Sequence, residues 1–457
     1  MTLSDITAPT GDRELRDELG SGALLAGDPG YDAARSPWNV AIDQRPLAIV
    51  RPETVEEVVD VVRAAAARGI RIAPQATGHA AGALAGTDLS DTVLMQLNGL
   101  RGVSVDPDAR TARVLGGSLW NDVLEAAAPH GLTAPHGSAG DVGVVGYTLS
   151  GGLSFYARSV GLAVNHVRAV QIVTADGALL RASAEENPEL FWAVRGGSGA
   201  FGVVVSIEID LLPYADVFAG MLLWDGSHTD DVSHAWAAWT RTAPETATTT
   251  LRVMHFPPLP ELPPFLSGRS VVVVDGAIVE DDATAAALLE PLRALRPELD
   301  TFSRIPSAAL IGVHMDPPGP TPAVTDHAIL SALPAEAVDV FASVGWTPGV
   351  SIAELRHLGG AVGRRPQDAG AVGSIAGDYL VHTIAMTPVP EAIQPGIAAV
   401  RGGVSAFAPW HVDALALTFV DAGDVDRGRG FGASAAQLRA LKDQYDPQGT
   451  FAASQPV

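Results

Sequence analysis

The stretch 71-RIAPQATGHAAGALAG-86 decides the fold, because it joins a short strand to a loop of small residues that holds one histidine. Upstream, 47-LAIV-50 is typical of a buried strand, and 54-TVEEVVDVVRAAAARG-69 has helical periodicity. Thr54 and Glu57 have the spacing of a capping box, and Gly69 ends the pattern. The sequence therefore predicts a strand, helix, strand and loop, with His79 in a loop whose backbone can approach a ligand closely.

The same α+β pattern continues to about residue 213. We predict a hairpin turned at Asp176-Gly177, a helix in 188-PELFWAVRGG-197, and a buried strand in 201-FGVVVSIEIDLLP-213 that Pro213 ends. Beyond it the composition changes, with proline clusters at residues 256–265 and 316–322 that are expected to roof a pocket.

Further strands are expected in the second half, in 270-SVVVVDGAIVE-280 and 413-DALALTFVD-421, alternating with alanine-rich helices. A final helix is expected from Ser434, with Leu438, Leu441 and Tyr445 on one face and Pro447 after its end. The pattern favours one α+β domain over residues 1–213 and a second over 214–425, followed by a C-terminal segment, 426–457.

Composition restricts the chemistry. The 457 residues contain 52 acidic and 29 basic side chains, a net charge of −23, which disfavours nucleic acid and anionic membranes as partners. The N-terminus has neither the basic start nor the apolar core of an export signal, so we expect a cytoplasmic protein. Because the chain has no cysteine, disulfides, thiolate metal sites and thiol nucleophiles are excluded, and no metal site is predicted. The chemistry must come from His, Tyr, carboxylates or a bound cofactor.

Three glycine-rich segments lie in the first domain: the opening loop, 137-GSAGDVGVVGYTLSGGLSF-155 and 195-RGGSGAFGVV-204. Glycine lets backbone N–H groups close on an anion such as a diphosphate, which favours a nucleotide cofactor. Each segment alone is equally compatible with a tight turn. None has the spacing of a doubly wound dinucleotide fingerprint.

Read in order, several segments resemble the berberine-bridge-enzyme-like branch of the flavin oxidases with the vanillyl-alcohol-oxidase fold. The resemblance covers about residues 35–213 and 434–457, including 115–132, 140–177 and the tail 441-LKDQYDPQGTFAASQP-456. It implies a two-part FAD-binding domain of the PCMH type, made of the N-terminal half and the C-terminal tail, with an inserted α+β substrate domain. It also implies that His79 is the point of covalent attachment to the flavin, with a histidine that makes only hydrogen bonds as the alternative.

The resemblance assigns sixteen residues to the FAD site: Gln75, Ala76, Thr77, Gly78, His79, Ala80, Ser138, Ala139, Val142, Gly143, Gly146, Ser150, Gly151, Gly152, Val203 and Ser454. The chain departs from the family pattern at several of them. Ala139 stands where many members carry a second attachment cysteine, so a single link is expected. Gln75 and Thr77 replace the usual arginine and second glycine, and Ser454 replaces an asparagine. Ala416 and Thr418 replace the usual Tyr-x-Asn, so the usual catalytic tyrosine is missing.

Two residues are therefore assigned to catalysis, Glu354 and Tyr379, with Tyr147, Tyr156 and His382 in reserve. Desolvation near a flavin is expected to raise the pKa of Glu354, which suits a general base, although a pair with Arg356 or Arg364 is an equal alternative. Two further residues, Trp410 and His411, are expected to line the cavity or to pack in the core.

The resemblance implies an FAD-dependent oxidase. It would move hydride from a small secondary metabolite, alcohol, amine or sugar to flavin N5, and dioxygen would be reduced to hydrogen peroxide. Three alternatives stay open: a cyclase or isomerase without net oxidation, a flavin-dependent dehydrogenase, and a protein that binds flavin passively. The partners expected are the substrate and dioxygen, in a monomer or homodimer.

Overall fold

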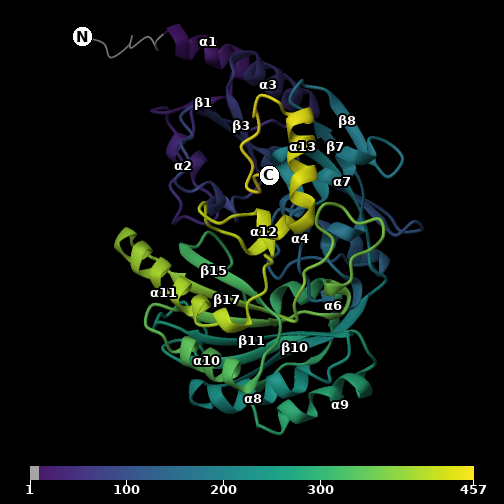
Figure 1. Cartoon of the computed structure of the whole chain (residues 1–457), viewed down its shortest axis with the longest axis vertical. Helices are drawn as coiled ribbons and strands as arrows, with labels where there is room; N and C mark the ends of the chain where they lie inside the picture. Colours follow the sequence, from purple (N-terminus) through teal and green to yellow (C-terminus); the bar gives the residue numbers. More distant parts are fainter. Residues whose placement is uncertain (1–9) are drawn as a thin grey trace.

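The computed structural model describes residues 10–457 and contains three β-sheets (Figure 1). The first sheet is mostly parallel and has the order β1-β2-β4-β3. Its strands are β1 (Leu24–Leu25), β2 (Ala48–Val50), β4 (Thr92–Gln96) and β3 (Arg71–Gln75), with helices α1 (Thr10–Leu19), α2 (Tyr31–Arg35) and α3 (Val55–Arg68). Both strands and the helix predicted around the histidine loop are confirmed within two residues.

Local chemistry explains the bounds of α3. The Thr54 side chain accepts a hydrogen bond from the Glu57 amide, and Gly69 ends the helix with φ 66°. The Glu57 carboxylate accepts from the amide of Glu53 at 2.7 Å rather than from Thr54, so the cap is one residue wider than a standard capping box. Val58, Val61 and Val62 are buried on the helix face that packs on the sheet.

The second sheet is antiparallel, with the order β5-β6-β9-β7-β8. Its strands are β5 (Val103–Asp106), β6 (Thr111–Leu115), β9 (Val203–Asp210), β7 (Val167–Val173) and β8 (Leu179–Ser183). It carries α4 (Trp120–Ala127), α5 (Val144–Leu149) and α7 (Pro188–Gly197), whereas α6 (Ala157–Val160) contacts β11 of the third sheet. The predicted hairpin is β7–β8, in which Gly177 has φ 73°. The predicted proline-started helix is α7.

The third sheet has eight strands, in the order β13-β10-β12-β11-β16-β17-β15 with β14 beside β10. The strands are β10 (Asp216–Asp225), β11 (Ala247–His255), β12 (Ser270–Ile278), β13 (Leu299–Asp300), β14 (Ser303–Pro306), β15 (Ala323–Leu330), β16 (Ile352–His357) and β17 (Tyr379–Met386). Helices α8 (Thr229–Thr240), α9 (Asp282–Arg293) and α10 (Ala335–Gly345) lie below it in Figure 1, and α11 (Ile393–Ser405) lies at the left beside β15 and β17.

Strand alternation divides this third sheet into two chemically different faces. The face toward the helices is apolar and includes Leu251, Val274, Leu355 and Val381, all fully buried. The opposite face carries charged and polar residues, because the neighbouring positions along the same strands are occupied by Arg252, Asp275, Glu354, Arg356 and His382.

The C-terminal segment contains α12 (Gly428–Phe431) and α13 (Ala435–Tyr445), and it returns to the first two sheets (Figure 1). Leu438 and Leu441 of α13 are buried, as predicted. Phe451 forms a parallel bridge to Ile72 of β3, and the amide of Ile72 donates to the carbonyl of Thr450 at 2.7 Å. The tail therefore extends the sheet that ends in the histidine loop.

The mixed α+β fold is confirmed, but the strand predicted over residues 413–421 is wrong. Leu417–Phe419 forms a 3-10 turn there, and the amide of Ala416 donates to Nε2 of His327 at 3.2 Å instead of pairing with a strand. Ala416 and Leu417 are buried because other elements pack against them, so the run of apolar residues does not belong to a sheet.

No helix within residues 10–457 combines the length and apolar character needed to cross a bilayer.

Candidate functional site

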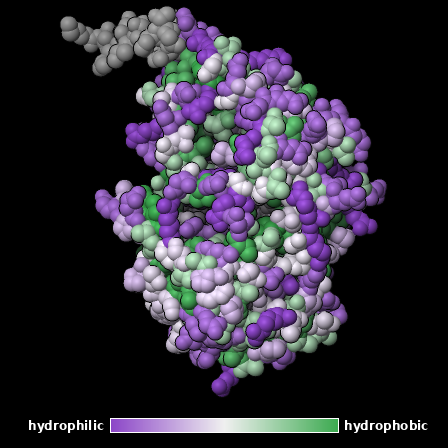
Figure 2. Space-filling model, viewed as in Figure 1, coloured by the Kyte–Doolittle hydropathy of each residue, from purple (hydrophilic) through white to green (hydrophobic). Residues whose placement is uncertain are grey.

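A cavity of about 450 Å³ lies between the third sheet and the first two sheets. The outer surface is largely hydrophilic, and hydrophobic residues are visible in the hollow between the two halves of the molecule (Figure 2). One side of the cavity is formed by the loop after β3, by residues from the two other glycine-rich segments and by the C-terminal tail. The other side is formed by the polar face of the third sheet and by 418-TFVD-421.

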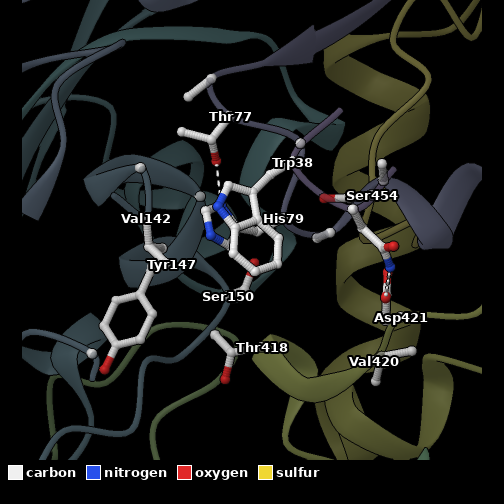
Figure 3. A pocket seen from close by; sticks show the side chains of 18 of the residues that line it. Trp38, Thr77, His79, Val142, Tyr147, Ser150, Thr418, Val420, Asp421 and Ser454 are labelled. Carbon is white, nitrogen blue, oxygen red and sulfur yellow. Dashed lines mark hydrogen bonds between the residues drawn. The ribbon is translucent and has the colours of Figure 1, made fainter. Parts of the chain in front are cut away.

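His79 is held in the cavity wall by three neighbours, of which Figure 3 shows Trp38 and Thr77. Its ring stacks on Trp38 with a centroid distance of 4.2 Å. Its Nδ1 atom lies 2.7 Å from the Thr77 hydroxyl, and its Nε2 atom lies 3.5 Å from the carboxylate of Asp141. Trp38 in turn donates to Asp141 at 2.6 Å. Burial alone would raise the pKa of Asp141, but His79 and Trp38 lower it overall, so Asp141 is a carboxylate that fixes both rings.

Thirteen of the sixteen residues predicted for FAD line this cavity. They are Gln75, Ala76, Thr77, Gly78, His79, Ala80, Ser138, Ala139, Val142, Gly143, Gly146, Ser150 and Ser454. Backbone of the third glycine-rich segment also reaches it, through Ser198, Gly199 and Gly202. The structure thus brings together segments that are separated by up to about 380 positions in the chain.

Gly151, Gly152 and Val203 do not line the cavity. The two glycines have φ values of 113° and 75°, and a Cβ on Gly152 would lie 2.6 Å from Ala163, so they serve a tight turn. Val203 points into the core of the first two sheets, and its neighbour Val204 lines the cavity because successive strand residues face opposite sides.

Asp421, which was not among the predicted site residues, lies in the cavity wall (Figure 3). Its carboxylate accepts hydrogen bonds from the amide of Gly82 and from the side chain of Asn39, both at 2.9 Å. Burial raises its pKa to about 7, against the effect of both hydrogen bonds. Asp421 therefore connects the histidine loop to the segment that crosses from the third sheet. Asp421 is the last residue of the segment 413–421, for which a strand was predicted, so a place in the cavity wall was not expected.

Gln455 was also missed. Its amide nitrogen donates to the carbonyl of Leu417 at 3.0 Å, whereas its Oε1 atom is buried in the cavity wall without a partner. It is adjacent to Ser454, which the resemblance did assign.

The third sheet presents Arg356, His382 and Thr325 to the cavity, and Thr418 and Tyr147 lie close to the same space. The pKa of His382 is lowered to about 4, chiefly by burial, so its imidazole is neutral and its Nδ1 atom has no partner. Burial also raises the pKa of Tyr147, whose hydroxyl is likewise unpaired. Of the two proline clusters, the second reaches the cavity through Asp316, Pro317 and Thr321, whereas residues 256–265 do not line it.

Glu354 lies behind the cavity wall rather than in it. Its side chain is only 2% exposed and accepts a hydrogen bond from Nε of Arg356, which is the pairing considered as the alternative. The expected rise in its pKa is wrong: burial acts in that direction, but Arg356 and His314 outweigh it and hold the pKa well below 4.5.

Tyr379 faces away from the cavity. It lies on the helix-covered face of β17, where its hydroxyl is 2.8 Å from the Thr240 hydroxyl and its ring stacks on His357 at 5.5 Å. His382 lies three positions further along the same strand, so strand alternation turns the side chains of Tyr379 and His382 to opposite faces of the sheet. Tyr156, Trp410 and His411 do not line the cavity either.

The site fits a large polar ligand with both ring and anionic parts. Tyr147, His382 and Gln455 each present a buried polar atom without a partner among the described residues, and such atoms require a hydrogen-bonding ligand. Apart from Trp38, the wall near His79 is formed largely by small residues such as Ala76, Gly78 and Ala80. Among the described residues, Arg356 is the only lysine or arginine that lines the cavity, so a diphosphate would be held by backbone amides and not by basic side chains.

Comparisons with known proteins agree with this fit. Residues 46–183 match the family described as "FAD binding domain". The chain is 35% identical to (R)-6-hydroxynicotine oxidase of Paenarthrobacter nicotinovorans over 199 residues, 43% of each chain. It is 34% identical to a xylooligosaccharide oxidase of Thermothelomyces thermophilus over 209 residues, 44% of this chain and 41% of the relative. The chain thus aligns with less than half the length of these curated relatives.

Solved structures resemble nearly the whole chain. A variant of Physcomitrella patens BBE-like 1 superposes with a TM-score of 0.85 and 20% identity, covering 97% of this chain and 98% of that one. 6-Hydroxy-D-nicotine oxidase of Arthrobacter nicotinovorans superposes with a TM-score of 0.81 and 21% identity, covering 94% and 96%. At this identity the likeness concerns the fold.

The fold and the site together define a flavoprotein whose cofactor is FAD. More narrowly, residues 46–183 match the FAD-binding-domain family, and the whole chain has the fold of the berberine-bridge-enzyme-like proteins, as the sequence resemblance indicated.

Proposed function

We propose that this protein is an FAD-dependent oxidase of a small secondary metabolite, alcohol, amine or sugar. The observation that carries the proposal is a single cavity in which a backbone-lined wall around His79 faces a strand surface bearing Arg356 and His382. When bound, FAD accepts a hydride from the substrate C–H bond and passes the two electrons to dioxygen. The substrate loses one hydride and one proton, and dioxygen gains both to give hydrogen peroxide.

In this proposal the chain is organised in two units. Residues 1–213 and 426–457 hold FAD, and residues 214–425 supply the substrate-facing sheet. The tail supports this division because Lys442 of α13 donates to the carbonyl of Ala200 at 2.7 Å and Phe451 pairs beside Ile72. Ser454 and Gln455 thereby reach the same cavity as the histidine loop.

The residues that orient the substrate lie on the third sheet, on α5 and in the segment 417–419. Ile352, Ile384 and Phe419 give the wall an apolar surface that excludes water, while His382 and Tyr147 offer unpaired polar atoms. Neutral His382 is suited to accept the hydrogen bond of a substrate hydroxyl or amine as its proton leaves. Glu354 acts as a positioning residue, because its carboxylate fixes Nε of Arg356. His382→Ala should therefore lower kcat by a larger factor than it lowers the flavin content of the purified protein.

A single covalent link through His79 is part of the proposal. Trp38, Thr77 and Asp141 restrict the imidazole from three sides, and Ala139 cannot provide a second link. Acid precipitation of the purified protein tests this: the yellow colour should remain in the pellet of the natural protein and be lost from His79→Ala. His234→Ala, which changes an exposed histidine of α8, is the matched control. Complete release of colour from the natural protein would contradict the link.

Turnover distinguishes the oxidase from its alternatives. With the purified flavoprotein and a panel of alcohols, amines and sugars, an oxidase bleaches the flavin band anaerobically, regains it in air, and forms one hydrogen peroxide per product. Product without peroxide or dioxygen uptake would indicate an isomerase or cyclase. Bleaching with slow recovery in air would indicate a dehydrogenase, and no bleaching with any bound compound would indicate a passive flavin-binding protein.

A further inference from the structure

Five charged side chains form a buried cluster behind the cavity: Arg252, Asp275, His314, Glu354 and Arg356. Each has a side chain that is at most 15% exposed. Arg252 pairs with Asp275, and Arg356 pairs with Glu354. Arg252 and Asp275 lie on the neighbouring strands β11 and β12, whereas Glu354 and Arg356 both lie on β16, the other neighbour of β11. Strand register therefore places these four side chains, and His314 joins them from the segment after the 3-10 helix Ser307–Gly312.

His314 lies between the two pairs of this cluster. Its Nδ1 atom lies 3.0 Å from Asp275 and its Nε2 atom lies 3.3 Å from Glu354, so each ring nitrogen faces a carboxylate oxygen. Burial and Arg252 act against protonation, but the nearby carboxylates prevail and raise the pKa of His314.

Arg356 is the member of the cluster that reaches the cavity. Its Nε atom donates to Glu354, its Nη2 atom lies 3.3 Å from His314, and its guanidinium carbon lies 4.9 Å from the centre of the Phe419 ring. Within residues 10–457, no acceptor contacts Nη1. A guanidinium fixed by its other atoms and left with a free N–H edge is a preorganised receptor for a planar oxyanion.

We propose that the substrate carries a carboxylate, which binds to Arg356 at the floor of the cavity. This inference rests on the proposed function, because it names the substrate class of the same site. A carboxylate would pair with Nη1 of Arg356, which has no acceptor among residues 10–457. Asp316, the nearest further carboxylate in the cavity wall, is half-buried and makes no hydrogen bond to Arg356 among the described residues. The negative charge of Asp316 would repel the bound carboxylate.

Benzoate and benzamide provide the test, because they have nearly the same size and shape and differ in charge. Each is titrated into the purified flavoprotein while the visible flavin spectrum is recorded. Benzoate should bind at least about tenfold more tightly than benzamide, and Arg356→Gln should weaken benzoate by about ten- to a hundredfold while changing benzamide by less than about threefold, as expected for a charge-assisted hydrogen bond. Asp316→Asn should tighten benzoate only.

Two further variants control for folding. Arg364→Gln changes an exposed arginine that pairs with Glu245, and it should leave both affinities unchanged. Glu354→Gln/Arg356→Gln removes both charges of one pair without leaving a buried charge alone, and it should still lose the preference for benzoate.

Equal binding of the two probes, or equal weakening of both by Arg356→Gln, would overturn the proposal. A shift of the flavin reduction potential in Arg356→Gln with benzoate affinity unchanged would also overturn it, because the cation would then serve the cofactor. These outcomes all require retained flavin. A protein that binds no FAD would instead refute the proposed function itself.

Discussion

The buried pair between Arg252 and Asp275 allows a quantitative test of the third sheet. The two side chains are 3% and 0% exposed, and Asp275 also contacts Thr250 and His314. Removing one partner of a buried pair typically costs about 3–5 kcal/mol. In Arg252→Met, His314 still faces Asp275, so the cost of removing the pair should lie near the lower end of this range. The carbonyl of His314 also loses the donor that lies 2.8 Å away, which adds about 1 kcal/mol.

We therefore expect Arg252→Met to lower the free energy of unfolding by about 3–4 kcal/mol. Urea denaturation followed by tryptophan fluorescence measures this change, because five of the eight tryptophans lie in residues 214–425: Trp224, Trp236, Trp239, Trp346 and Trp410. Arg304→Met is the control. It breaks exposed pairs with Asp216 and Asp282 and should cost at most about 1 kcal/mol.

The pH dependence gives a second check. Burial would raise the pKa of Asp275, but Arg252 and His314 lower it overall, so its pairing stabilises the fold above the ordinary pKa of 3.8 and is lost as the pH falls through the lowered value. Without Arg252 the pKa of Asp275 rises, so the variant should approach the natural protein in stability as the pH falls through that raised value. Arg252→Met/Asp275→Asn should recover most of the loss at neutral pH. A loss no larger than that of Arg304→Met, or no recovery in the double variant, would refute the reasoning.

Three further predictions concern the site. Gly82→Ala should lower flavin content, because its Cβ would lie 2.3 Å from the carboxylate of Asp421, while Gly402→Ala, with nothing within 4 Å, should not; absorbance per protein measures both. Because burial raises the pKa of Asp421 to about 7, the free energy of unfolding should fall as the pH rises from about 4 to about 7, and Asp421→Asn should flatten that part of the profile of Tm against pH. Tyr379→Phe should cost about 1 kcal/mol of stability by removing the bond to Thr240 and should leave kcat unchanged, whereas a large loss of kcat would restore a catalytic role.

Much of the FAD side of the site was predictable because its signals are local. A capped helix between two short strands determines where the loop around His79 begins, and glycines in the second segment mark backbone that can approach a ligand. The same reasoning could not separate glycines that line the cavity from those that only turn the chain. Gly143 and Gly152 look alike in sequence, but only Gly143 borders the cavity.

The substrate side was less predictable because it depends on strand parity and register. Tyr379 and His382 occur on the same strand, and a one-residue difference in phase decides which of them faces the cavity. Glu354 was correctly expected on a strand, but its pKa depends on Arg356 and His314, and His314 lies 40 positions away. Apolar alternation over residues 413–421 gave no sign that the segment would cross the cavity wall as a 3-10 turn.

The amino-acid sequence alone determined the FAD-binding fold, the position of His79 in its loop and the absence of any cysteine chemistry, since these depend on residue identity and on contacts between near neighbours. Only the tertiary structure decided that Arg356 reaches the cavity, that Glu354 forms an ion pair with it behind the wall and that Asp421 connects two distant segments. The interaction between charged groups depends on their distance and their burial, so the chemical roles of these residues are set by which distant strands pack together.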